Sequence, residues 1–113
     1  MISQFVSMQN ETNKKMYQKM KNQNVELQLI YYSENDGIEK RGLPEFLSRR
    51  SYKFKRLEKK MIEYAQRNSD IVTFYFSYDE QIEVVFYIED NECLVFVKVE
   101  TPVAHYVGRE RIR

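Results

Sequence analysis

The hydrophobic positions of this chain first recur at the spacing of a helix. In residues 2–21, apolar side chains stand three or four positions apart, and the lysines lie elsewhere. Such spacing places the apolar side chains on one face of a helix. We therefore predict a first amphipathic helix over residues 2–21, with a core-facing stripe rich in methionine: Phe5, Met8, Thr12, Met16 and Met20.

The period then falls to two, which is the spacing of a strand. Within residues 25–32, Leu27, Leu29 and Tyr31 alternate with the residues between them, so we place these three side chains on one face. The sequence Asn-Asp-Gly at 35–37 is typical of a tight turn. It predicts a short hairpin, with residues 38–40 as the second strand.

A second helix is predicted over residues 44–67. Pro44 suits the first turn of a helix, because the N–H that proline lacks would have no partner there. Apolar side chains then recur at helical spacing as far as Ala65. We expect this stripe to be buried: Leu43, Leu47, Phe54, Leu57, Met61, Tyr64 and Ala65.

Three runs with strand period follow, over residues 71–78, 82–88 and 93–99. The links between them are so short that only antiparallel neighbours are allowed, and the runs predict a meander. One face of the meander is apolar throughout: Val72, Phe74, Phe76, Ile82, Val84, Phe86 and Ile88. The other face presents Tyr75, Val85 and Tyr87, together with either Leu94 and Phe96 or Cys93, Val95 and Val97.

These elements predict one α+β domain over residues 1–113. Two helices pack on an antiparallel sheet of four or five strands, which ends in the C-terminal three-strand meander. A chain of 113 residues has room for one modest core. Residues 101–113 carry three arginines, and we expect them to form a flexible basic tail.

Charge is divided along the chain, although the total is only +1. Residues 44–69 carry eight Lys or Arg against three Asp or Glu, a net charge of +5. Residues 70–100 carry one Lys against eight acids, a net charge of −7. The two segments therefore attract partners of opposite charge.

Cysteine usage and hydropathy bear on location. The single cysteine, Cys93, cannot form an internal disulfide, which favours a reducing compartment, and we expect the protein to be cytoplasmic. No stretch approaches the roughly 18 consecutive apolar residues of a membrane span. The N-terminus lacks the features of a signal peptide, and we expect no membrane association.

The basic flank of the second helix is one candidate functional surface. At 100° per residue its cations fall on one side, where they could meet several phosphates of a nucleic acid. The alternative is a solvated helix face, with some cations paired to the acidic turns of the meander. The nucleic-acid candidates are Arg49, Lys53, Arg56, Lys60 and Arg67 of this region and Arg109, Arg111 and Arg113 of the tail.

The second face of the meander is the other candidate surface. A face that meets water alternates apolar with polar residues, and this one does not, so we expect it to be covered by the first helix, by a second copy or by a partner. Its aromatic rings could stack nucleic-acid bases, but Glu83 shares the face and only Lys98 adds positive charge. Methionines of the first helix could add an adaptable apolar surface, and the alternative is that they are only the core side of a peripheral helix. The protein-interface candidates are Tyr75, Val85, Tyr87, Phe96, Met8 and Met16.

Residues suited to catalysis are few. His105 lies in the tail and Cys93 in a predicted strand, so they assemble neither a Cys–His pair nor a zinc ligand set. Asp79, Glu83 and Lys98 resemble the acids and lysine of metal-dependent nucleases, but their order along the strand does not match. We expect no enzymatic activity, no metal and no cofactor.

Together these patterns predict a non-enzymatic interaction module of the adaptor, regulator or inhibitor type. It binds a protein partner, or another copy of itself, through the apolar and aromatic sheet face. The alternative is a nucleic-acid-binding accessory protein that uses the basic flank of the second helix.

Overall fold

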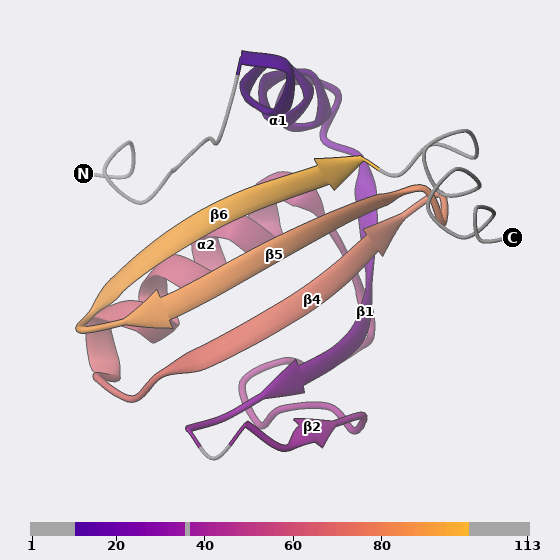
Figure 1. The fold of residues 1–113 in the computed structure, drawn as a ribbon. Coiled ribbons are helices and arrows are strands. Elements are labelled where there is room, and N and C mark those ends of the chain that lie inside the picture. The colour runs from indigo at the N-terminus through magenta and orange to yellow at the C-terminus, as the bar shows by residue number, and fades with distance from the viewer. Residues whose placement is uncertain (1–10, 36, 100–113) are drawn as a thin grey trace, which may run out of the picture.

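The computed structural model describes residues 11–35 and 37–99. Within these residues the chain forms two helices and a six-stranded antiparallel sheet, which confirms the predicted α+β class (Figure 1). The elements follow in the order α1 (Glu11–Gln23), β1 (Glu26–Ser33), β2 (Glu39–Lys40), β3 (Ser51–Lys53), α2 (Phe54–Arg67), β4 (Val72–Tyr78), β5 (Ile82–Glu89) and β6 (Glu92–Val99).

The strands of the sheet lie in the order β2-β1-β4-β5-β6, and the short strand β3 also pairs with β1. The hairpin of β1 and β2 and the meander of β4, β5 and β6 are antiparallel, as the sequence predicts. The meander is in continuous register, with Val72 opposite Ile88 at one end and Tyr78 opposite Ile82 at the other. Its face assignments therefore hold along the whole length of the strands.

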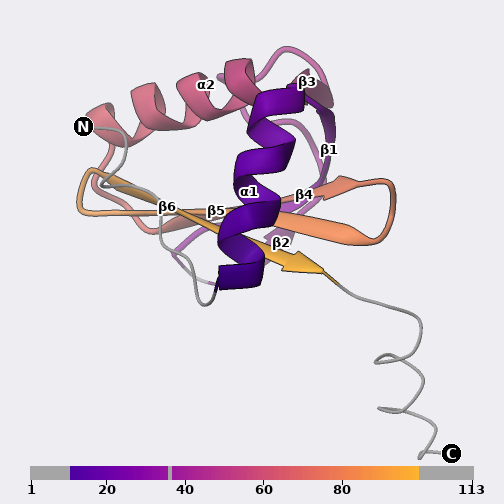
Figure 2. The same cartoon turned by 90° about the horizontal axis from the view of Figure 1, so that it is seen from above.

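α2 packs over one face of the sheet and forms the core with it (Figure 2). The buried stripe of the helix includes Phe54, Leu57, Met61 and Ala65. The core side chains of β4 and β5 come from alternate positions, as predicted: Val72, Phe74, Phe76, Val84, Phe86 and Ile88. In β6, where the sequence left two alternatives open, Cys93, Val95 and Val97 face the core. This register of β6 leaves Leu94 and Phe96 for the opposite face.

α1 stands at an edge of the sheet. Figures 1 and 2 show it beside β6, running across the plane of the sheet, with its C-terminal end near the start of α2. Tyr17 and Met20 enter the core, and Met16 packs against it. The methionines at positions 16 and 20 therefore serve packing. Met8 lies outside the described residues, as do the rest of residues 1–10.

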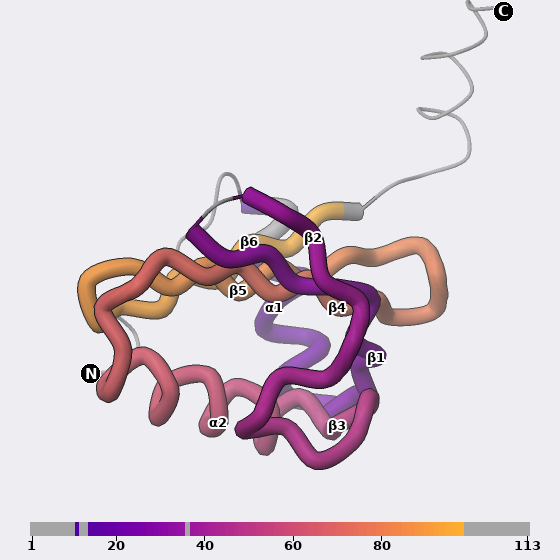
Figure 3. Tube along the Cα trace, turned by 90° about the horizontal axis from the view of Figure 1, so that it is seen from below, coloured from indigo at the N-terminus to yellow at the C-terminus, as the bar shows by residue number. Residues whose placement is uncertain are grey.

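The predicted helix over residues 44–67 is wrong in its first part. Pro44 begins a single turn, in which the Leu47 N–H donates to the Pro44 carbonyl at 3.1 Å, and the chain then runs to β3 (Figure 3). The Arg50 carbonyl accepts a hydrogen bond from the Leu29 N–H at 2.8 Å, beside the pairing of β3 with β1. These inter-strand bonds compete with helix formation where four polar residues, 48–51, interrupt the apolar stripe.

Leu43, predicted to belong to the buried stripe, is instead 44% exposed. It precedes the turn at Pro44, and α2 begins only at Phe54. Leu43 and Leu47 are four residues apart, a spacing that places two side chains on one face only within a helix. The residues between them are not part of α2, so this spacing does not bury Leu43. Leu47 is buried all the same, because the single turn at Pro44 directs it into the core.

A β-bulge in β1 places Tyr31 on the face opposite to the predicted one. Leu29 pairs with Phe76 and Tyr31 pairs with Tyr75, so Ile30 is an extra residue on β1. One extra residue reverses the faces of all residues that follow it. Leu29 is buried, whereas Tyr31, predicted to share its face, stacks on Tyr75 at the other face of the sheet.

Neither helix of the described part is long and apolar enough to cross a membrane. The segment over residues 101–113, predicted to be a basic tail, lies outside the described residues. So do His105 and the tail arginines.

Candidate protein interface and basic helix face

The face of the sheet opposite α2 is not covered by either described helix. Figure 2 shows α2 on one side of the sheet and α1 at the β6 edge. We name the opposite side the open face. Its residues come from four strands: Gln28, Tyr31, Ser33, Thr73, Tyr75, Ser77, Glu83, Val85, Tyr87, Glu89, Glu92, Leu94, Phe96 and Lys98.

The register arranges the centre of the open face as two rows across the sheet. One row is apolar or aromatic throughout and consists of Tyr31, Tyr75, Val85 and Phe96; the next runs from the hydroxyl side chains of Ser33 and Thr73 to Tyr87 and Leu94. The rings of Tyr31 and Tyr75 stack with centroids 4.3 Å apart. Val85 is only 6% exposed, and the aromatic side chains around it are half-buried. The rows therefore form one continuous apolar surface with Val85 near its middle.

The ends of the open face are charged. Glu83 stands opposite Lys98 at one end, and Glu89 stands opposite Glu92 at the other. The Tyr87 hydroxyl donates to the Glu89 carboxylate at 2.7 Å, and this hydrogen bond raises the pKa of Tyr87. A small hollow of about 160 Å³ lies at this acidic end, lined by Tyr87, Glu89, Asp90, Glu92 and Leu94. An apolar centre with a polar rim is typical of protein interfaces.

The described cations on and beside the open face are few, and each faces an acid. Lys98 lies opposite Glu83. Arg41, whose guanidinium carbon is 5.4 Å from the centroid of the Tyr31 ring, forms an ion pair with Glu39 at 3.3 Å. The charge of this surface that remains available to a partner is therefore the acidic end.

The predicted protein-interface residues fall into two groups. Tyr75, Val85, Tyr87 and Phe96 lie together on the open face. Tyr31 joins them through the bulge, which no local pattern in the sequence signals. Met16 lies apart from them on α1 and packs against the core.

The solvent side of α2 is the second candidate surface. Its buried positions, which include Leu57 and Met61, take one side of the helix. The exposed side carries one carboxylate, Glu63, and a row of cations. We name these cations, with those brought beside them from the preceding segment, the basic face: Arg49, Lys53, Lys55, Arg56, Lys59, Lys60 and Arg67.

Tyr52 brings Arg49 to the helix. The Arg49 guanidinium carbon and the Lys60 ammonium lie 5.3 Å and 5.6 Å from the centroid of its ring. The Tyr52 hydroxyl accepts hydrogen bonds from the Ser48 and Arg49 backbone N–H groups, at 2.7 and 3.2 Å. Hence Arg49 reaches the predicted group of cations although it precedes α2 by several residues. Lys55 and Lys59, which were not among the predicted cations, are exposed on the same side.

A buried polar cluster joins α1 to α2. Glu58 is 5% exposed; the Tyr17 hydroxyl donates to its carboxylate, and the Lys21 ammonium lies 3.2 Å from it. Burial, with the nearby charge of Glu58, raises the pKa of the Cys93 thiol to about 12. Burial and the Glu58 carboxylate also raise the pKa of Tyr17. The sequence signals Glu58 only by its helical spacing from Phe54 and Ile62.

The described residues contain no group of three or more His, Cys, Asp or Glu side chains placed to hold a metal ion. Of the acids and lysine compared with a nuclease site, Glu83 and Lys98 face each other across two strands. Asp79 lies in the turn before β5, with a φ of 56°. Cys93 is closed off within the core.

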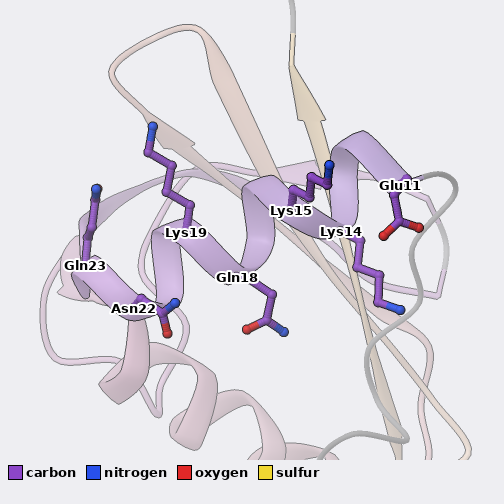
Figure 4. A pocket seen from close by; sticks show the side chains of 7 residues that line it. All are labelled: Glu11, Lys14, Lys15, Gln18, Lys19, Asn22 and Gln23. Atoms are coloured by element: carbon purple, nitrogen blue, oxygen red, sulfur yellow. The ribbon is translucent and has the colours of Figure 1, made fainter.

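The outward side of α1 is polar (Figure 4). A shallow hollow of about 540 Å³ runs over it and is lined by Glu11, Lys14, Lys15, Gln18, Lys19, Asn22 and Gln23. This lining has no aromatic ring. Its three exposed lysines form a second set of surface cations, away from the solvent side of α2.

No protein-family model, no curated protein and no solved structure matches this chain. Its function is therefore inferred from the two surfaces themselves. The open face is apolar with one acidic end, and the basic face is polar throughout.

Proposed function

We propose that this protein is a non-enzymatic interaction module whose open face binds a protein partner. The observation that supports the proposal is the continuous apolar surface around Val85, which no described helix covers. Contiguous apolar surfaces on small proteins mark interaction sites, because exposing them to water is unfavourable. The half-buried tyrosines also suit an interface, since each ring offers apolar area and a hydroxyl that can form a hydrogen bond.

The charges of the open face indicate the chemistry of the partner. A matching surface has apolar or aromatic side chains for the two central rows and basic side chains for the end that carries Glu89 and Glu92. A second copy of this chain matches less well. The cations on and beside its own open face, Lys98 and Arg41, already face Glu83 and Glu39.

Two substitutions on the open face test the proposal. Partners are first captured from the native host with the full chain, and their affinity for purified variants is then measured by calorimetry. Tyr87→Glu and Phe96→Lys each place a charge in the apolar surface, and we expect each to weaken binding by about tenfold or more with little change in melting temperature.

Leu43→Glu is the matched control, because Leu43 is an exposed apolar residue outside the open face. It should leave the affinity unchanged. A partner that binds Tyr87→Glu, Phe96→Lys and Leu43→Glu equally well does not use the open face, and the proposal would then be wrong.

A further inference from the structure

The basic face of α2 is a second surface with its own charge. Seven cations gather on it, and Glu63 is the one acid on the solvent side of the helix. Its formal charge is therefore +6, although the whole chain carries only +1. Arg50 does not belong to the basic face, because its guanidinium group is held by hydrogen bonds that it donates to the Leu29 and Arg41 carbonyls.

Lys53 lies opposite Glu26 in the pairing of β3 with β1, and the other six cations have no acidic partner among the ion pairs of the described part of the chain. The ion pairs found there involve Lys21, Lys40 and Arg41, and none belongs to the basic face. Glu58, the acid of α2 closest to the middle of the row, is buried on the other side of the helix. The alternative that the sequence left open, pairing of this flank with the acidic turns of the meander, therefore has no support in these contacts.

The dimensions of the basic face suit a row of phosphates. Lys55 and Arg67 are twelve residues apart on one helix, which corresponds to about 18 Å along its axis. A nucleic-acid duplex presents one negative charge per about 1.7 Å of its length, so several cations can meet phosphates at once. The N-terminal end of α2, around Lys55, adds the positive end of the helix dipole.

We propose that the basic face of α2 binds the phosphate backbone of a nucleic-acid duplex without reading its sequence. Recognition of bases in single strands uses exposed aromatic rings, and the solvent side of α2 has none; Tyr52, next to it, is buried. Long cationic side chains contact phosphates, which are the same at every base pair. The ligand is thus recognised by the negative charge of its phosphates and by their spacing along the duplex.

This inference does not rest on the proposed function, because the two surfaces lie on opposite sides of the molecule. Figure 2 shows α2 on one side of the sheet, and the open face is the other side. A duplex on α2 and a protein on the open face can therefore be bound at the same time. Such a domain would attach its protein partner to nucleic acid.

The test uses the full chain and a fluorescently labelled DNA duplex of about 20 base pairs, with anisotropy measured at salt concentrations between about 50 and 200 mM. We expect the logarithm of the binding constant to fall with the logarithm of salt concentration with a slope of about −3 to −5. Two duplexes of unrelated sequence should bind equally within about twofold.

The decisive variant replaces three exposed cations of α2 together: Lys55→Gln, Arg56→Gln and Lys59→Gln. None of the three side chains makes a described contact, so folding should be retained, which circular dichroism verifies. We expect the salt slope to flatten by about two to three units and the affinity at low salt to fall at least tenfold. The matched control removes the same charge from α1, as Lys14→Gln, Lys15→Gln and Lys19→Gln, and should retain most of the binding.

Several outcomes would overturn the inference. No binding at low salt, or equal losses from the α1 and α2 triple variants, would show that the basic face has no special role. Binding to vesicles that contain about one third phosphatidylserine, with no binding to the duplex, would indicate a membrane surface instead. Tyr87→Glu should leave duplex binding intact. A failure of the duplex proposal can therefore be distinguished from a failure of the proposed protein interface on the open face.

Discussion

Glu58 illustrates at the scale of a single residue how a polar group can hold two elements together. A carboxylate removed from water is strongly destabilising unless it is paired and hydrogen-bonded. The Tyr17 hydroxyl and the Lys21 ammonium, both on α1, supply those partners. The cluster therefore ties α1 to α2 beside β6, and it accounts for the position of α1 at the edge of the sheet.

The neighbouring thiol of Cys93 leads to a prediction about pH. Its pKa is about 12 in the folded protein, against an ordinary value of 9.0, so above about pH 9 the unfolded chain loses this proton first. The free energy of unfolding should therefore fall as pH rises from about 9, by at most about 1.4 kcal/mol per pH unit for this group. Tyr17, whose pKa is also raised, adds a loss of the same sign above its ordinary value of 10.0.

Urea denaturation between about pH 7 and pH 10.5 measures this dependence. Cys93→Val removes the thiol while keeping a small apolar side chain, so it should flatten the fall between about pH 9 and pH 10. An identical slope in Cys93→Val would show that the buried thiol does not control stability in this range.

At the scale of an element, α2 depends on a residue outside the helix. Its N-cap residue, Lys53, makes no capping hydrogen bond with its side chain. The Lys55 N–H donates instead to the Asn24 side-chain oxygen at 2.9 Å, and the Phe54 N–H donates to the Val25 carbonyl at 2.7 Å. The segment between α1 and β1 thus satisfies two of the first N–H groups of α2.

We expect Asn24→Ala to lower the free energy of unfolding by about 2 kcal/mol. About half of this is the lost cap, and the rest arises because Asn24 has a φ of 50°, which alanine adopts less readily than asparagine. Asn24→Gly accepts this φ and should lose only the cap, whereas Asn24→Asp keeps the acceptor and should change stability little. Denaturation midpoints in urea rank the three variants, and equal stability of Asn24→Ala and Asn24→Asp would contradict the cap.

At the scale of the whole molecule, the two candidate surfaces face away from each other. The sheet separates the open face from α2, and α1 closes the β6 edge between them (Figure 2). A partner on one surface therefore does not need to displace a partner on the other. The charge division of the sequence corresponds to this arrangement, because cations cover α2 while Glu89 and Glu92 lie at an end of the open face.

This arrangement predicts a monomer with an accessible apolar surface. The isolated protein should remain monomeric in light scattering at about 100 μM and should bind an apolar dye such as ANS without unfolding. Tyr87→Glu should reduce the dye signal, whereas Leu43→Glu should not. A stable dimer that Tyr87→Glu dissociates would instead mean that a second copy covers the open face.

The sequence by itself determined the features that depend on near neighbours along the chain. Alternating residues and links of a few residues allow only an antiparallel meander, so β4, β5 and β6 and the buried face of β4 and β5 follow from local pattern, whereas the face of β6 was settled only by its register with β5. Helical spacing likewise identifies most of the buried stripe of α2 and three of its cations, Arg56, Lys60 and Arg67. The apolar centre of the open face and most of the basic face were predictable for this reason.

Only the tertiary structure decided the features that arise from contacts between distant segments. β3 forms because residues 51–53 pair with β1, and that pairing delays the start of α2 to Phe54. The bulge at Ile30 carries Tyr31 to the open face, and the ring of Tyr52 brings Arg49 to the basic face. Periodicity records which side a residue takes within its own element, whereas pairing register and side-chain contacts across the fold determine which elements exist and what they meet.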